Sequence, residues 1–225
     1  METITRPMFC PYCGNIFQVT LHTEIIIPGE EALKKKILNK TMHFPKCPSC
    51  RNELKIKGNC LYINETRGEL YALAEDENET IENLMKVGDS HSFLKGYLKR
   101  RLVYNVDAFR EKILLSDYNY DDRIVELMKL ELSKGIEKEN HQPVYRIFVD
   151  DVSGNEIRIT AIMGAKAPFE YITIKTPAST YTQFSRQYLE RLKKPEDDEY
   201  VETDQDWAKR SGILDHERKQ VLIET

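Results

Sequence analysis

The sequence predicts a mixed α+β protein, in which a zinc-ribbon-like β module packs with a pair of helices and a small β-hairpin/helix unit follows. Three observations carry this prediction. Two Cys-Pro-x-Cys motifs bracket strand-like residues near the N-terminus, and apolar residues with helical spacing follow residue 105. Apolar alternation on both sides of Ser153-Gly154-Asn155 then indicates a hairpin.

The composition is typical of a folded chain with a charged surface. Of the 225 residues, 40% are hydrophobic and 31% are charged. No stretch approaches the roughly 18 apolar residues of a membrane span, and the first residues lack the apolar core of a signal peptide. We therefore expect a cytoplasmic protein with no membrane partner. In that reducing compartment, paired Cys-x-x-Cys motifs usually hold metal.

Residues 1–62 are predicted to form the β module. Apolar residues between 16 and 27 predict strands after the first motif, and Pro28-Gly29 ends that pattern. A short helix is expected over 30–38, with acids in its first turn and lysines later, as the helix dipole favours. Strand-like alternation resumes over 54–63, after the second motif.

The four cysteines of the two motifs are the predicted ligands of one structural zinc ion: Cys10, Cys13, Cys47 and Cys50. Zinc takes four ligands in a tetrahedron, and each Cys-x-x-Cys turn supplies two sulfurs. The gap between Cys13 and Cys47 is longer than the roughly 15–20 residues of a compact ribbon, so a strand and a helix are inserted between its halves. His22 and His43 lie nearby, and we expect them at surface or half-buried positions. Cys60 is expected in the core.

A redox interpretation of the first motif competes with the metal interpretation. Cys-Pro-Tyr-Cys is also the active-site tetrapeptide of glutaredoxins, whose first thiol lies at a helix N-terminus. The residues after Cys13 favour a strand over a helix, and a second Cys-Pro-Ser-Cys has no redox role. Thiol redox chemistry therefore stays an alternative.

The middle of the chain is predicted to be a polar segment followed by a helical pair. Residues 64–92 are polar and acid-rich, and residues 75–79 within them are predicted as an exposed loop or the frayed start of a helix. Apolar stripes over 106–114 and 124–128 predict two helices within 105–134. Asp121 and Asp122 are expected in the first turn of the second helix.

The rest of the chain divides into a β-hairpin/helix unit at 141–194 and an acidic linker with a C-terminal helix at 195–225. A third strand is expected near 171–174, and Thr176-Pro177 is expected to begin a helix. Seven acids and no base lie between Glu196 and Asp206, and Trp207 is expected to begin the last helix.

Charge gives no strong sign of nucleic-acid binding. Residues 1–60 hold nine Lys/Arg against five Asp/Glu, but the whole chain has a net charge of −4. Lys99-Arg100-Arg101 is interpreted as a solvated helix face, with phosphate contact as the competing interpretation. The acids Asp117, Asp121, Asp122 and Glu126 are interpreted as caps and helix surface. No phosphate-binding glycine loop, nucleophile elbow or His-Glu-x-x-His motif is present, so no catalytic or cofactor-binding residue is predicted.

The sequence to about residue 130 resembles the CpXC family, which is named for its two Cys-Pro-x-Cys motifs and is found in bacteria and archaea. Beyond the motifs, the resemblance includes three later segments: 103–105, 109–113 and 121–129. It carries over the four cysteines as the defining residues of the family. It also implies that the zinc module and the helices of 105–134 form one domain, residues 1–134. It implies no reaction, substrate or partner.

The leading hypothesis is a non-enzymatic zinc-binding protein that serves as a protein-interaction or scaffold module. Four cysteine ligands close the coordination of zinc and leave no open position for a substrate. The expected partner is a protein. A nucleic-acid-binding zinc-ribbon protein is the first alternative, and a thiol redox protein is the second.

Overall fold

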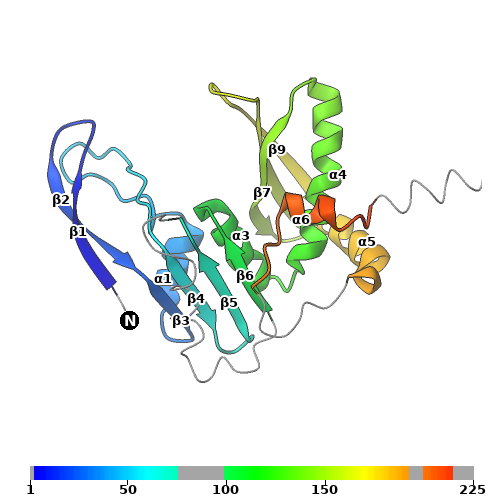
Figure 1. Ribbon diagram of the computed structural model, residues 1–225, viewed down its shortest axis with the longest axis horizontal. Coiled ribbons are helices and arrows are strands. Elements are labelled where there is room, and N and C mark those ends of the chain that lie inside the picture. Colours follow the sequence, from blue (N-terminus) through cyan, green and yellow to red (C-terminus); the bar gives the residue numbers. More distant parts are fainter. Residues whose placement is uncertain (1–2, 76–98, 193–199, 215–225) are drawn as a thin grey trace, which may run out of the picture. The chain divides into compact units, whose positions relative to one another are not determined.

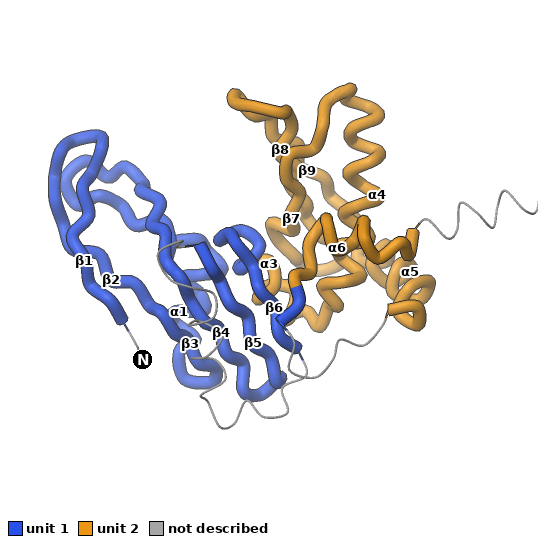
Figure 2. The backbone as a smooth tube through the Cα atoms, viewed as in Figure 1, with its two compact units in different colours: residues 1–110, 196–201 blue, residues 111–195, 202–225 orange. Residues whose placement is uncertain are grey.

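The structure is a computed structural model that describes residues 3–75, 99–192 and 200–214. Within these ranges it contains three small β-sheets and five α-helices, which confirms the mixed α+β class (Figure 1). The chain divides into two compact units, residues 1–110 with 196–201 and residues 111–195 with 202–225 (Figure 2). None of the described helices is long and apolar enough to cross a membrane. The residues predicted to form a frayed helix lie largely outside the described ranges.

The first unit begins with a two-stranded antiparallel ribbon. Strand β1 (Thr3–Phe9) pairs with β2 (Ile16–His22), and the register places Phe9 opposite Ile16. Exposed and less exposed side chains alternate along the ribbon, because successive side chains point to opposite faces and one face is covered. The first cysteine motif lies in the turn that connects these strands.

A four-stranded mixed sheet forms the centre of the first unit. Its strands, in spatial order, are β3 (Glu24–Ile27), β4 (Cys60–Asn64), β5 (Glu69–Leu73) and β6 (Lys99–Val103). Every residue of β4 and β5 is buried. On one face, Leu61, Leu70 and Leu102 belong to an apolar cluster that Tyr200 covers. Between β3 and β4, helix α1 (Glu31–Leu38) confirms the predicted short helix.

One sequence prediction is wrong at this sheet. Lys99-Arg100-Arg101 opens the strand β6 and is no solvated helix face. The buried strand β5 lies within the acid-rich segment 64–92, where no strand is predicted. Cross-strand pairing explains how such polar residues enter a sheet. Lys99 lies opposite Glu69 and forms an ion pair with it at 3.7 Å. Arg100 lies over the ring of Tyr200, 5.5 Å from its centroid.

The second unit combines helices with a three-stranded meander. Helix α3 (Val106–Asp117) begins in the first unit and continues into the second. The other elements are α4 (Asp122–Asn140), β7 (Val144–Ser153), β8 (Glu156–Met163), β9 (Glu170–Pro177), α5 (Ala178–Tyr188), a 3₁₀ turn (Leu189–Arg191) and α6 (Gln205–Arg210). The strands pair in the order β7-β8-β9, all antiparallel. This confirms the helical pair, the hairpin and the third strand.

Details at the helix ends differ from the predictions. Asp121 caps α4 by accepting a hydrogen bond from the Arg123 N–H at 2.9 Å, as an acid in that turn should. Helix α4 continues through Gly135 to Asn140, because a long helix tolerates the roughly 1 kcal/mol cost of one glycine. Helix α6 begins two residues before Trp207, after the cap Asp204. The division into units falls inside α3, and a domain boundary at residue 134 stays a prediction.

Candidate metal centre

The two Cys-Pro-x-Cys turns bring their four sulfurs into one cluster. All four Sγ atoms lie within 4.8 Å of one another. The Sγ atoms of Cys10 and Cys50 are 3.6 Å apart, and those of Cys13 and Cys47 are 3.7 Å apart. Each of these close pairs joins one motif to the other. Among the described residues, no other group of three or more His, Cys, Asp or Glu side chains is arranged to hold a metal ion.

The same backbone turn positions the sulfurs in both motifs. The N–H of the first cysteine donates to the carbonyl five residues later, and the N–H four residues later donates back to the carbonyl of that cysteine, at 2.9 Å in each case. The residue at this fourth position adopts a positive φ in both turns, 75° at Gly14 and 63° at Arg51. Glycine adopts that conformation without strain, whereas a residue with a Cβ does not. The two cysteine turns are therefore a structural repeat, in which only the turn that contains Arg51 is strained.

Amide groups of the second turn surround its sulfurs. The Asn52 side chain donates from Nδ2 to the Sγ of Cys50 at 3.4 Å. The backbone N–H groups of Cys50 and Ser49, against the effect of burial, lower the pKa of Cys47 to about 6. The backbone N–H of Asn52 likewise lowers the pKa of Cys50. These donors favour thiolates, which is the form of cysteine that binds metal.

Cys13, in the first turn, holds its proton more strongly. The Asn15 N–H donates to its sulfur and favours the thiolate, but burial and the three neighbouring sulfurs together raise the pKa of Cys13 to about 12. Four thiolates at this spacing would repel one another without a cation between them. A metal ion that binds here would therefore displace protons from the cluster.

The donor set fits a single tetrahedral metal ion. A zinc–sulfur bond of about 2.3 Å in a tetrahedron places neighbouring sulfurs about 3.8 Å apart. The closest sulfur pairs, at 3.6 and 3.7 Å, match that spacing. A tetrahedral set of four sulfurs suits zinc or iron, because both bind soft thiolate ligands. The four sulfurs are thus close enough together to be ligands of one metal ion.

The cluster has only a small apolar surrounding. Cys10 and Cys47 are fully buried, and Leu54 is the other buried residue packed with them. Met8 and Phe17 cover the cluster in part. So few apolar contacts contribute little stability, since each fully buried large side chain contributes about 1.5–3 kcal/mol.

The nearby histidines and the fifth cysteine lie outside the cluster. His43 is 3% exposed and meets the ring of Phe109 edge to face, with centroids 6.3 Å apart. The expected surface or half-buried position is therefore wrong for His43, although it stays outside the ligand set as expected. Its burial, with a smaller effect from the nearby Lys55, lowers its pKa to about 4. Cys60 is buried in β4, which confirms its prediction as a core residue.

A second cluster of ionisable groups is buried in the second unit, where caps and helix surface were predicted. Asp121 is a cap, but Asp122 and Glu126 are buried. The Nζ of Lys112 lies 3.2 Å from Asp122 Oδ2 and 3.2 Å from Glu126 Oε1. The interpretation of Asp122 and Glu126 as cap and helix surface is wrong, because residue spacing alone does not show which face of a helix other elements cover.

Lys129 links this cluster to a third carboxylate. Its Nζ lies 2.8 Å from Glu126 Oε1 and 2.9 Å from Glu111 Oε2. The Val149 N–H donates to Glu111 Oε1 at 2.7 Å. Although burial opposes it, contact with Glu111 and Glu126 raises the pKa of Lys129. The charged spacing of 122, 126 and 129 along one helix was the only sign of this cluster in the sequence.

Comparison with known proteins identifies the family to which the chain belongs. No curated protein and no solved structure matches the chain significantly. The family model described as CpXC protein matches residues 8–129, which is more than half of the chain and includes all four clustered cysteines. The chain therefore belongs to the CpXC protein family.

Proposed function

We propose that this protein is a non-enzymatic protein-interaction module whose N-terminal part is held together by one structural zinc ion. The observation that carries the proposal is the cluster of four sulfurs, which all lie within 4.8 Å of one another and include two pairs at tetrahedral spacing. Four protein ligands complete the coordination of zinc and leave no position for a water or a substrate. Structural zinc sites have this closed form, whereas catalytic sites keep one position open.

The arrangement of the first motif supports a structural role over a redox role. The low-pKa thiol of a glutaredoxin-like site lies at the N-terminus of a helix. Here the residues after Cys13 enter strand β2, and Cys10 follows strand β1. Cys10 is also fully buried, which keeps it from a disulfide substrate. These features favour zinc as the partner of the sulfurs.

The proposal is tested by alkylation of the thiols, with and without a chelator, in the full chain as purified. We expect all four cluster cysteines to resist alkylation until the chelator is added, and then to react together. Mass spectrometry of the peptides assigns each modified cysteine. Cys60 serves as the internal control, since it is buried in β4 and reacts only on unfolding of the sheet.

Two results would contradict the proposal. Rapid alkylation of Cys10 before chelation would show a free reactive thiol and would revive the redox alternative. Turnover in a disulfide-reductase assay that Cys10→Ser abolishes would do the same. A zinc-bound protein without such turnover is the expected result.

A further inference from the structure

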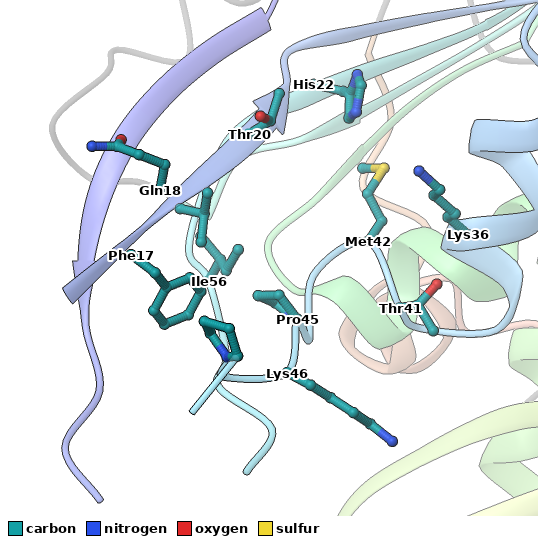
Figure 3. Close-up of a pocket in the computed structure, with 12 residues that line it drawn as sticks. Phe17, Gln18, Thr20, His22, Lys36, Thr41, Met42, Pro45, Lys46 and Ile56 are labelled. Atoms are coloured by element: carbon teal, nitrogen blue, oxygen red, sulfur yellow. The ribbon is translucent and has the colours of Figure 1, made fainter. Parts of the chain in front are cut away.

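A groove of about 510 Å³ runs beside strand β2 in the first unit (Figure 3). Five of its lining residues belong to β2 and include Phe17, Thr20 and His22. The other side is formed by Lys36 of α1 and by residues between 41 and 48. A groove of this size is within the range of about 300–1,000 Å³ that ligand sites occupy.

The groove follows the free edge of the ribbon. Neighbouring residues of β2, such as Phe17 and Gln18, line it together, although their side chains point to opposite faces of the strand. No residue of β1 lines it. Because the groove is lined by side chains from both faces of β2 and by none from β1, it lies along the edge of β2 that faces away from β1. Among the described residues, β2 pairs with no strand except β1.

The edge presents backbone hydrogen-bonding groups to the groove. The Cys10 N–H donates to the Asn15 carbonyl at 2.9 Å, which makes this position a hydrogen-bonded pair of the ribbon. Such pairs alternate along an antiparallel ladder, so Gln18 and Thr20 point their N–H and C=O groups away from β1. Pro7, which has no N–H, lies opposite Gln18 and fits this alternation.

The two ends of the groove differ in chemistry. Phe17, Pro45 and Ile56 form an apolar end (Figure 3), and Phe17 also packs against the cysteine cluster. Lys36 and His22 lie at the other end, and no carboxylate lines the groove.

Two side chains at the polar end of the groove are available to a ligand, those of Lys36 and His22. Within the described residues, Lys36 forms no ion pair, whereas Lys46 faces Glu53 at 3.7 Å. The Nδ1 of His22 is buried and has no hydrogen-bond partner. Lys36 is therefore the lysine of the groove that an acidic ligand can pair with.

We propose that this groove binds an extended, acidic peptide segment of a partner protein, which adds to β2 as a third strand of the ribbon. The proposal rests on the protein-interaction function proposed above. Strand addition gives affinity through the exposed backbone groups, and side-chain pockets give specificity. An aliphatic residue fits the apolar end, and a carboxylate about four residues away reaches Lys36, at ~3.3 Å per residue. A zinc ion with four thiolate ligands has a net negative charge, which would repel a carboxylate at the apolar end. The carboxylate of the peptide is therefore expected at the Lys36 end.

The test uses short fluorescein-labelled peptides on an alternating Thr/Val scaffold, measured by anisotropy against the full-length, metal-loaded protein. Each peptide has two variable positions, four residues apart. One position carries an aliphatic residue, and each aliphatic residue is tried in turn. The other position, on either side of the first, carries Glu, Gln or Lys. We expect saturable binding of a Glu peptide that is weaker for its Gln counterpart and weakest for its Lys counterpart. Absence of binding by every Glu peptide would overturn the proposal.

Methylation of the peptide backbone tests strand addition directly. Alternate N–H groups of an added strand point toward β2, so N-methylation at every second position should reduce affinity more than tenfold. N-methylation at the intervening positions should have little effect. Equal effects at all positions would contradict strand addition, and the protein needs no substitution in this test.

Charge reversal at Lys36 tests the predicted selectivity. Lys36 is exposed, so Lys36→Glu should fold, and it should weaken the Glu peptide about tenfold while improving the Lys peptide. The matched control is Lys35→Glu, an exposed position in the same helix turn that does not line the groove. Similar losses in both variants would overturn the assignment of Lys36.

Zinc content, measured on the same samples, separates this proposal from the one on which it rests. Zinc present without peptide binding would overturn the groove proposal alone. Absence of zinc would overturn the proposed function. Two other occupants would also contradict the peptide: a second copy, seen as self-association that blocks peptide binding, and a single-stranded oligoribonucleotide whose binding depends on Lys36.

Discussion

Each part of the molecule contains a cluster of ionisable side chains. The cluster in the N-terminal module consists of four cysteines, whereas the buried cluster in the second unit consists of two lysines and three carboxylates. When ionised, the cysteines carry charge of one sign only. The second cluster holds both signs and compensates most of its own charge. With all four cysteines ionised, the module would need a bound cation to balance their charge, while the second cluster contains lysines that balance most of its carboxylates.

Removal of the cation from each cluster gives the sharpest comparison between them. Under the proposed function, a strong chelator removes zinc from the cysteine cluster of the N-terminal module. Because structural zinc contributes about 10–16 kcal/mol in apparent terms, we expect residues 10–56 to lose their fold. Hydrogen exchange followed by mass spectrometry should show rapid exchange there, while α4 keeps its protection. Unchanged protection across residues 10–56 after verified zinc removal would show that the apolar contacts suffice.

Lys129→Met is the equivalent change in the second unit. It leaves Glu111 and Glu126 buried with one cation fewer, and loss of one member of a buried pair costs about 3–5 kcal/mol. Urea unfolding of the zinc-loaded protein measures this change. The control on the same helix is Lys134→Met, which removes a partly exposed pair with Glu131 and should cost about 0.5 kcal/mol or less. Equal effects of the two substitutions would mean that the buried cluster contributes no more than a surface pair.

A smaller effect concerns pH and His43. Its pKa is about 4 in the folded protein, against about 6.5 when unfolded. The unfolded chain therefore binds the extra proton first, and the stability from neutral His43 is complete above pH 6.5 and lost as pH falls toward 4. We expect wild type to lose about 1 kcal/mol more than His43→Leu between pH 7.5 and 5.5. Parallel stability curves for the two zinc-loaded proteins would contradict this assignment.

The smallest expected effect compares the two cysteine turns with each other. Arg51 holds a positive φ of 63° that glycine adopts freely, and Gly14 holds the matching position in the first turn. Arg51→Gly should stabilise the module by up to about 1 kcal/mol, less the entropy that glycine adds to the unfolded chain. Gly14→Ala should destabilise it by a similar amount, and thermal unfolding of both variants measures the difference. A loss in both would show that the Arg51 side chain makes a contact that outweighs its strain.

The sequence predicted best where local pattern and local structure coincide. The cysteine spacing brought the four ligand candidates together because metal-binding turns are short and self-contained. The hairpin around Gly154 and the cap at Asp121 were predicted for the same reason, since turn and cap residues act within a few positions.

The predictions failed where tertiary contacts decide. Strands β5 and β6 are buried on both faces, so they lack the alternation that marks a half-buried strand, and their charged residues are balanced across strands. Glu126 and Lys129 have the spacing of a helix surface pair, but both are buried. The groove beside β2 is formed by segments distant in the sequence and left no local signal.

The central claim is that four cysteines hold one structural zinc ion, and the most direct test is metal stoichiometry. Elemental analysis is made on the full chain, purified without added metal, beside a variant in which Cys10, Cys13, Cys47 and Cys50 are all serine. We expect one zinc per wild-type chain and none in the variant. Wild-type protein without zinc, with iron in its place, or with zinc that the variant retains would contradict the claim.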